Sequence, residues 1–478
     1  MSDHRPEHIH LNLFEMNTPG HISHGLWTHP DNNRHRFNEL GFWTELAQIL
    51  EAGLFDSVFI ADVIGAYDGF RGGPETALRE GVQIPNNDPL LVVPAMAAVT
   101  KHLGFAVTFS TSYEPPFAWA RRLSTVDHLT NGRVGWNVVT SYLPNAARNF
   151  GLADEIEHDH RYQIADEYLD VTYKLWEGSW DDDAVQLDRD QRIYTDPAKV
   201  RYVNHEGAYY KVAGPHLSEP SPQRTPVIFQ AGVSDAGKAF AAKHAEAVFL
   251  GGRSVDDLRK HADDIRTQAE RNGRGRDAVR FFPGAAVIVG RNDDEVARKV
   301  AEFERLRSVD GHLAHAGAGL DWAKYPRDTR IADIIARKDP GYQRIERRYD
   351  QDKTVGEIVD QFSKISRGAF FVAGTPKEVA DTLIGWVDES GVHGFNLRQF
   401  LTPGTAEDIA TLLIPELQRR GRYRESYADG ETLRERLFGA GRNYLPDTHP
   451  GARYRDPAVR DAAGFTTGKP SAPEAEVA

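Results

Sequence analysis

Residues 131–151, NGRVGWNVVTSYLPNAARNFG, give the clearest indication of the fold. An Asn-Gly turn signal opens the stretch, and residues 133–141 are then a mostly apolar run with β-branched side chains. Such a run predicts one buried strand, which ends before the following proline. Because α/β folds place ligands at the carboxyl ends of buried strands, the polar exit of this strand is of interest. Taken alone, an ordinary strand with a polar end is the simpler interpretation. The polar residues at this exit are Asn137, Thr140, Ser141 and Tyr142.

The composition favours a small-molecule partner over nucleic acid or a membrane surface. The chain of 478 residues has 57 Lys and Arg against 70 Asp and Glu, a net charge of −13, and no basic block. Nucleic-acid and anionic-membrane binding need positive charge, so both are disfavoured. The absence of cysteine excludes disulfides, thiolate catalysis, iron–sulfur clusters and cysteine-based zinc sites.

The N-terminal residues MSDHRPEHIHLNLFEM lack the pattern of a charged region followed by an apolar one that marks a secretory signal. No run of about 18 apolar residues occurs in the chain. We therefore expect a cytoplasmic protein without a membrane segment.

Eight predicted strands alternate with helical segments along the chain. This alternation is typical of a (β/α)₈ TIM barrel, an α/β fold in which a ring of parallel strands is surrounded by helices. The predicted strands are residues 8–16, 56–62, 103–111, 133–141, 226–234, 247–250, 281–289 and 394–401.

One barrel domain accounts for most of the chain. We expect it to cover residues 1–421 and to carry several long insertions. After Gly421 the composition shifts towards Arg, Gly, Pro and charged residues, which predicts an extended C-terminal arm, residues 422–478, with a disordered tip. The expected insertions are residues 17–40, 63–87, 177–225 and 309–354.

Two short motifs suggest other chemistry, but their positions argue against it. His8-Ile9-His10 resembles a metal-binding pair, yet it lies at the amino end of the first strand, away from the barrel mouth. Residues 273–278 fit a loose G-x-G-x-x-A pattern, yet they follow a helix and precede a strand, the reverse of the dinucleotide-binding order. We therefore predict neither a metal site nor an internal nicotinamide site.

Polar residues near the carboxyl ends of the strands would meet in a barrel. A carboxylate, several hydroxyls and an amide without a metal cluster suit the binding of a large polar cofactor. The sequence from Ser234 to Gly237 begins a helix and would either bind a phosphate or serve as a plain N-cap. His158 and Tyr162, four residues apart, can approach the same ligand, although a core tyrosine and a solvated histidine explain the spacing as well. The strand-end residues are Asp62, Thr108, Asn137, Ser141 and Ser234.

Long motifs throughout the chain resemble one known family. They include HLNLFEMN, FIADV, NDPLLVVPAMAAVT, ARRLSTVDHLTNGRVGWNVVTS, HDHRY, KLWEGSW and EPSPQRTPVIFQAGVS, with the looser GTPKEVADTL and GFNLR in the second half. These motifs are similar to those of the bacterial-luciferase-like, flavin-dependent monooxygenases. Within that family they resemble the group of nitrilotriacetate, dibenzothiophene-sulfone and dimethyl-sulfide monooxygenases.

The resemblance implies a two-component FMNH₂-dependent monooxygenase on a TIM barrel. A separate NAD(P)H:flavin reductase would supply reduced FMN, whose C4a-(hydro)peroxyflavin, formed with O₂, would oxygenate the substrate. By the same resemblance, Asp62 and Thr108 would bind the flavin, and His158, Tyr162 and Ser234 would hold its ribityl phosphate side. Asn137 is added from barrel geometry.

Substrate specificity would depend on the aromatic loops, because members of this group oxidise sulfides, sulfones, chelators and halogenated aromatics on one scaffold. We expect the pocket to be walled by Trp27, Tyr67, Trp136 and Tyr142. Few cations stand near the predicted mouth, which favours a small apolar organosulfur or aromatic substrate. A homodimer or homotetramer is expected. The alternatives are a deazaflavin-dependent hydride-transfer oxidoreductase on the same barrel and a non-enzymatic flavin-binding barrel.

Overall fold

The main sheet of the protein is built from ten strands, all paired in parallel. A computed structural model describes residues 8–232, 234–316, 321–339, 342–365, 368 and 370–468. The strands of the main sheet are β1 His10–Met16, β2 Ser57–Ala61, β3 Gly104–Ser110, β4 Val134–Val139, β9 Val227–Ala231, β10 Ala247–Phe249, β11 Arg280–Phe281, β12 Gly284–Val289, β13 Phe371–Gly374 and β14 Gly394–Arg398. Their order is β11-β10-β9-β4-β3-β2-β1-β14-β12-β13.

This order confirms the predicted TIM-barrel type of fold. All eight predicted strands are present, and the predicted strand 281–289 is divided into β11 and β12. Pro283 has no N–H group to donate, so the ladder is interrupted there. The paired strands do not form a closed ring. The segment that holds β11 and β12 nevertheless joins the two sides, because β11 pairs with β10 and β12 pairs with β14.

Helices surround the sheet and follow the strands along the chain. The helices are α1 Leu40–Ala52, α2 Glu75–Glu80, α3 Val93–Ala98, α4 Pro116–Leu129, α5 Pro144–Asn149, α6 His158–Tyr173, α7 Asp235–His244, α8 Val255–Arg271, α9 Asp293–Leu306, α10 Val309–Ala316, α11 Ile331–Arg337, α12 Tyr342–Arg348, α13 Val355–Gln361, α14 Pro376–Ser390, α15 Gly404–Asp408, α16 Ile414–Arg419, α17 Leu433–Phe438 and α18 Pro457–Ala462. The largest hydrophobic cluster lies between these helices and the strands, and it includes the fully buried Trp43, Trp119 and Trp136.

A second apolar cluster fills the barrel interior near its amino end. Phe14, Phe59 and Phe229 from three strands pack there with Leu433 and Leu437 of α17. The C-terminal arm is therefore more than an extended segment, because its helix α17 contributes leucines to the core. The predicted disordered tip, residues 464–478, is described up to residue 468, and this first part is ordered, because Phe465 packs in the largest apolar cluster and Thr466 bridges to Tyr202. Residues 469–478 lie outside the described residues.

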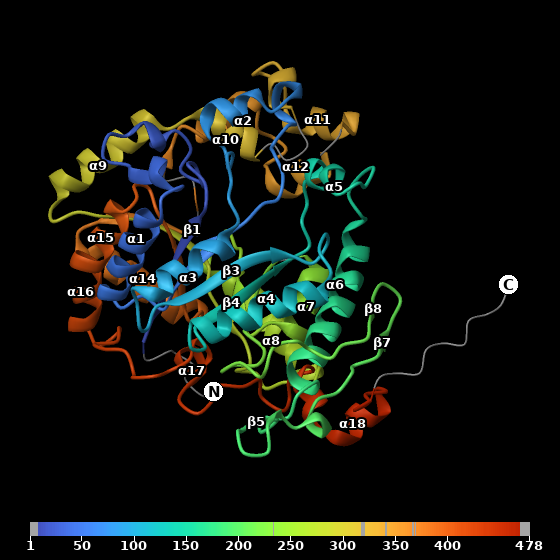
Figure 1. Cartoon of the computed structure of the whole chain (residues 1–478). Helices are drawn as coiled ribbons and strands as arrows, with labels where there is room; N and C mark the ends of the chain where they lie inside the picture. Colours follow the sequence, from blue (N-terminus) through green and yellow to red (C-terminus); the bar gives the residue numbers. More distant parts are fainter. Residues whose placement is uncertain are drawn as a thin grey trace.

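The insertions form a cap over the opposite, carboxyl end of the strands. Figure 1 shows α2, α10, α11 and α12 gathered at the top of the molecule, with α17 and α18 at the bottom. A separate apolar cluster joins the loop after β2, the loop after β4 and the insertion at 309–354. It includes Tyr67, Leu143 and Leu313. The insertion at 177–225 forms two hairpins, β5 Val185–Asp188 with β6 Ile193–Thr195 and β7 His205–Glu206 with β8 Lys211–Val212.

Strand β13 was not predicted. It is only four residues long and pairs with β12 at the end of the ladder. So short an apolar run between two helical segments gives no periodic signal. Among the described residues, no helix is both long enough and apolar enough to cross a membrane.

Candidate functional site

Polar side chains from β2, β3 and β4 meet at the carboxyl end of the barrel. Asp62 directly follows β2, and Thr108 of β3 lies opposite Asn137 of β4 in the strand register. The Asn137 side-chain amide donates a hydrogen bond of 2.9 Å to the Thr108 hydroxyl. Just beyond the end of β4, the Ser141 hydroxyl donates to the hydroxyl of Ser110, the last residue of β3, at 2.7 Å. The predicted convergence of the strand-end residues is therefore present in the fold.

Two buried polar atoms in this region lack a partner. Asn137 Oδ1 and Gln230 Oε1 have no hydrogen-bond partner among the described residues, and both side chains are almost fully buried. Buried polar atoms are nearly always hydrogen-bonded in folded proteins. These two acceptors therefore fit a site that a polar ligand with N–H or O–H donors completes.

The start of α7 lies beside the same region. Ser234 caps the helix by accepting a hydrogen bond of 3.1 Å from the Gly237 N–H. A Cβ atom at Gly237 would lie 3.0 Å from both the Ser234 hydroxyl and the Tyr162 hydroxyl, so only glycine leaves this corner open. Burial raises the pKa of Tyr162, and contacts with Ser234 and Gln230 oppose that rise. Ser234 is an N-cap, and the free N–H groups of the helix start are available to an anion as well.

A cavity of about 300 Å³ lies next to these groups, although Thr108, Asn137, Gln230 and Ser234 are not among the residues of its wall. Asp62, Ser141, Tyr142, His158 and Tyr162 all lie in its wall. The remainder of the wall is largely apolar and includes Val63, Ile64, Val138, Leu143, Ala146 and Phe240. His158 is half-exposed, its ring centroid lies 5.3 Å from that of Tyr162, and its Nδ1 contacts Asp159 at 2.7 Å. The cavity thus joins a polar side to an apolar side.

Asp62 has an altered acidity in this setting. Burial raises the pKa of its carboxyl group to about 6, a hydrogen bond from the Asn86 amide at 2.8 Å opposes the rise, and the nearby Asp88 charge adds to it. A carboxyl group with this pKa changes its protonation state close to neutral pH, as groups at ligand sites often do.

A hydrogen-bonded chain of side chains reaches the cavity from the insertions. The Tyr67 and Tyr142 hydroxyls lie 2.5 Å apart, and Tyr67 also donates to Gln83 Oε1 at 3.1 Å. Gln83 Nε2 lies 3.3 Å from His315 Nε2, and His315 Nδ1 lies 3.0 Å from His24 Nε2. Tyr67 and Tyr142 were predicted, whereas the sequence did not single out Gln83, His24 or His315 as site residues. The only available signal was their position in long loops, where functional residues concentrate.

The fold does not bring Trp27 and Trp136 to this cavity. Trp136 is fully buried on the outer side of β4, where it packs against Trp119 of α4 and Tyr168 of α6. Successive side chains of a strand point to opposite faces, so Trp136 faces outward because Asn137 faces inward. Trp27 is 45% exposed in a short 3₁₀ helix of the first insertion, away from the cavity wall.

The His8-x-His10 motif lies at the other end of the barrel, as its position in the sequence predicts. His10 begins β1, and its Nδ1 contacts Asp56 at 2.8 Å. Among the described residues, no group of three or more histidine, aspartate or glutamate side chains is arranged to hold a metal ion.

Comparison with known proteins identifies the family. The model of the luciferase-like monooxygenase family matches residues 16–394. The chain belongs to this family. A long-chain alkane monooxygenase from Geobacillus thermodenitrificans (strain NG80-2) is 54% identical over 94% of this chain and 98% of its own length. The dimethyl-sulfide monooxygenase of Hyphomicrobium sulfonivorans is 46% identical over 94% of each chain. Nitrilotriacetate monooxygenase component A of Aminobacter aminovorans is 32% identical over 87% of this chain and 93% of its own length.

Solved structures of the luciferase-like monooxygenase family agree with this assignment. The crystal structure of a long-chain alkane monooxygenase superimposes with a TM-score of 0.88 at 54% identity, covering 94% of this chain and 99% of the other. A riboflavin lyase, solved with modified FMN and riboflavin, gives a TM-score of 0.86 at 35% identity, covering 94% of this chain and 100% of the other. The protein is thus an enzyme of a monooxygenase family whose members include flavin-dependent proteins.

Proposed function

We propose that the protein is the oxygenase component of a two-component monooxygenase that uses FMNH₂ and O₂, with the reduced flavin supplied by a separate NAD(P)H:flavin reductase. The main support is the carboxyl end of the barrel, where a cavity lies near an open helix start and near two buried acceptors that have no partner in the described part of the chain. The family relationship supports the reaction class. The name of the nitrilotriacetate enzyme, a component A, supports a division of labour with a reductase.

The residues of the cavity suit the two ends of a flavin mononucleotide. Asn137 and Gln230 offer acceptors to the donors of a reduced flavin ring, and Asp62 and Thr108 lie on the same side of the barrel mouth. Ser234, Tyr162 and His158 gather at the start of α7, where the helix dipole favours the phosphate. When bound, the reduced flavin supplies the electrons that activate O₂.

The rest of the cavity would keep water away from the reacting centre. The apolar cluster formed by the insertions covers the carboxyl end, and the Tyr67–Tyr142 pair lies where this cover meets the cavity. Exclusion of water protects reactive oxygen intermediates from unproductive breakdown.

The paired cations of the mouth favour an apolar substrate. Arg71 contacts Asp310 at 3.0 Å, Arg148 contacts Asp68 at 2.6 Å and Arg161 contacts Glu155 at 2.8 Å. Neutralised cations offer little to a polycarboxylate substrate, whereas the apolar wall suits hydrocarbon or thioether groups. The relatives named for alkanes and for dimethyl sulfide point in the same direction. We therefore expect a small, apolar aliphatic or organosulfur substrate.

The direct test combines the purified protein, a generic NADH:FMN reductase, O₂ and a panel of n-alkanes, dialkyl sulfides, aryl sulfones and nitrilotriacetate. Mass spectrometry should detect a product with one added oxygen from an apolar member of the panel. Turnover with reduced deazaflavin but not with FMNH₂ would overturn the proposal. Binding of FMNH₂ without an oxygenated product from any apolar compound would favour a non-enzymatic flavin protein.

The proposed position of the flavin phosphate can be tested by substituting two helix-capping serines, one near the cavity and one as a control. Ser234 caps α7 and Ser254 caps α8 with the same hydrogen bond of 3.1 Å, but only Ser234 lies beside the cavity. Ser234→Ala should weaken FMNH₂ binding about tenfold, the loss expected for one hydrogen bond to a charged group. Ser254→Ala should cost similar helix stability and leave the flavin affinity unchanged. Equal affinities for both variants would contradict this position.

A further inference from the structure

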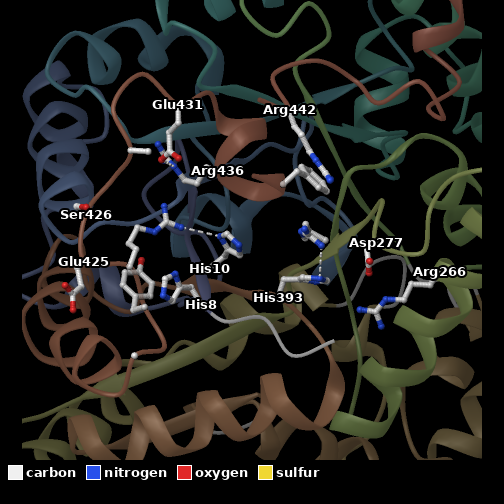
Figure 2. Close-up of a pocket in the computed structure, with 16 residues that line it drawn as sticks. His8, His10, Arg266, Asp277, His393, Glu425, Ser426, Glu431, Arg436 and Arg442 are labelled. Atoms are coloured by element: carbon white, nitrogen blue, oxygen red, sulfur yellow. Dashed lines mark hydrogen bonds and ion pairs between the residues drawn. The ribbon is translucent and has the colours of Figure 1, made fainter. Parts of the chain in front are cut away.

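A larger cavity, of about 940 Å³, lies at the amino end of the barrel, opposite the mouth. Its wall combines barrel residues, such as His10, Arg280 and His393, with residues of the C-terminal arm, such as Arg436 and Arg442 (Figure 2). The inner apolar cluster of Phe14, Phe59, Phe229 and the α17 leucines fills the barrel interior near this end. The wall shares no residue with that of the flavin mouth, so we treat it as a separate site.

The cations on one side of this cavity are neutralised. His10 and Arg424 both contact the buried carboxylate of Asp56. Arg436 contacts Glu431 at 2.7 Å and donates a second hydrogen bond to the Asp56 backbone carbonyl at 2.8 Å. These groups hold the arm against the barrel and have little charge left for a ligand.

On the other side, Arg280 and Arg442 are not neutralised. Arg280 donates to the Leu437 carbonyl at 2.9 Å, contacts His393 Nε2 at 3.3 Å and lies over the Phe438 ring at 4.8 Å. Among the described residues, no carboxylate lies within 4.0 Å of the guanidinium of Arg280 or of Arg442. Figure 2 shows Arg442 and Arg266 on the side of the cavity away from His10 and Arg436.

Three arginines therefore share this side of the cavity with two nearby acids, Asp263 and Asp277. Arg266 contacts Asp263 at 3.4 Å and donates to the Gly391 carbonyl at 2.7 Å. Burial lowers the pKa of Arg280, Asp277 opposes this effect, and the charges of Arg442 and Arg266 reinforce it. Asp277 is exposed and forms no close ion pair with these arginines among the described residues. The three arginines thus lie within electrostatic range of each other without full compensation.

We propose that this amino-end cavity binds the phosphate group of a small anionic metabolite through Arg280 and Arg442, with Arg266 contributing charge. Guanidinium groups match phosphate oxygens with planar, paired donors. The volume exceeds that of one phosphate ion, so the remainder of the metabolite would extend along the polar wall towards Ser426 and Glu425. Because Arg280 belongs to β11 and Arg442 to the arm, the ligand would tie the arm to the barrel. This site is independent of the proposed flavin site.

Pyrophosphate is a suitable probe, and isothermal titration calorimetry on the full-length protein measures its affinity. Because an anion could also bind at the start of α7, the titrations compare variants of each site. Arg442→Glu should weaken binding at least about tenfold, since it replaces a charge-assisted contact by repulsion. Asp277→Asn should strengthen binding several-fold, because it removes the opposing charge. Arg298→Ala, an exposed arginine whose closest acid is 3.7 Å away, and Ser234→Ala should leave the affinity unchanged.

Thermal unfolding provides a second readout, since a ligand that binds only the folded state raises Tm, and the rise grows with the ratio of ligand concentration to Kd. Pyrophosphate should raise the Tm of the wild type and of Arg298→Ala, and raise that of Arg442→Glu much less. Arg442 is exposed and pairs with no acid in the described part of the chain, so its variant should fold with the wild-type Tm in the absence of anion. Absence of binding at millimolar pyrophosphate overturns the proposal. Equal affinity in the wild type and Arg442→Glu, or loss of binding in Ser234→Ala, also overturns it.

Discussion

Asp56 precedes strand β2 and Asp62 follows it, yet their carboxyl groups lie in opposite environments. Asp56 is fully buried, and its carboxylate accepts a hydrogen bond from the Leu11 N–H at 2.8 Å and contacts His10 and Arg424. Burial by itself would raise the pKa of Asp56, but Arg424, His10 and Arg436 hold it well below its usual range. Asp62 has no cation of this kind, and burial raises its pKa to about 6.

The contrast between Asp56 and Asp62 reflects a difference between the two ends of the barrel. At the amino end, charges pair with each other across the junction between the barrel and the arm, as in Arg434 with Glu246. At the carboxyl end, Asn137 Oδ1 and Gln230 Oε1 have no partner in the part of the chain that the structure describes, and the pKa of Asp62 is about 6. In barrels of this type the active site lies at the carboxyl end, and the ion pairs at the amino end hold the arm to the barrel.

Removal of the Asp56 charge should produce the largest loss of stability. Asp56→Asn would leave the largely buried guanidinium of Arg424 without a counter-charge, and removal of one partner of a buried ion pair costs about 3 to 5 kcal/mol. Denaturant unfolding measures the loss. The double variant with Arg424→Ala should lose less than the sum of the two single variants, because the groups interact. A loss below about 1 kcal/mol would show that the amino end does not depend on this charge.

Asp62→Asn should raise the unfolding free energy at neutral pH, whereas Asp56→Asn lowers it. The folded pKa of about 6 lies above the unfolded value, so the folded state binds more protons between about pH 4 and pH 6 and loses stability as pH rises through that window. At pH 7.5 the wild type carries a buried, poorly compensated charge, and Asp62→Asn should gain about 1 to 2 kcal/mol. At pH 4 the two proteins should be equally stable. A pH-independent difference in unfolding free energy would contradict this interpretation.

The strand-end residues could be predicted because regular patterns dictate their positions. The parallel strands of a barrel have their carboxyl ends at the same face. A pattern of eight such strands therefore predicts that Asp62, Thr108 and Asn137 lie at one end of the barrel. The same alternation of faces places Trp136 outside the barrel, a consequence that the sequence contained although the aromatic character of this residue suggested a pocket wall.

Contacts between distant segments could not be predicted from local patterns. Asp56 and Arg424 are separated by 368 residues, and nothing in either segment indicates the other. His315 lies in an insertion without strand periodicity, so its approach to Gln83 and His24 depends on how the insertions pack. The arm was predicted to be extended because it is rich in charge and glycine, yet α17 places leucines in the core and arginines in ion pairs.

The open corner at Gly237, at the start of α7, provides a test of the proposed flavin site with a smaller expected effect. Gly237→Ala would place a Cβ 3.0 Å from the Ser234 and Tyr162 hydroxyls and displace at least one of them. We expect about tenfold weaker FMNH₂ binding, the loss of roughly one hydrogen bond to a charged group. Gly385→Ala in α14, where the Cβ would meet only Glu389 at 4.0 Å, should leave the affinity unchanged. Fluorescence titration with reduced FMN under anaerobic conditions measures both variants, and equal affinities would place the phosphate elsewhere.

Substitutions of Tyr67 and Tyr142 should give the smallest changes in stability, and they separate a role in stability from a role in the reaction. Tyr142 is 37% exposed, so Tyr142→Phe should change the unfolding free energy by less than about 0.5 kcal/mol. Tyr67 is buried and lies between Tyr142 and Gln83, so Tyr67→Phe should cost about 1 kcal/mol by leaving Gln83 without its donor. If the carboxyl end serves the reaction, both variants should lower kcat/KM several-fold, although only Tyr67→Phe lowers stability. Steady-state kinetics with the identified substrate separates the two effects, and wild-type kinetics in both variants would assign the pair a purely structural role.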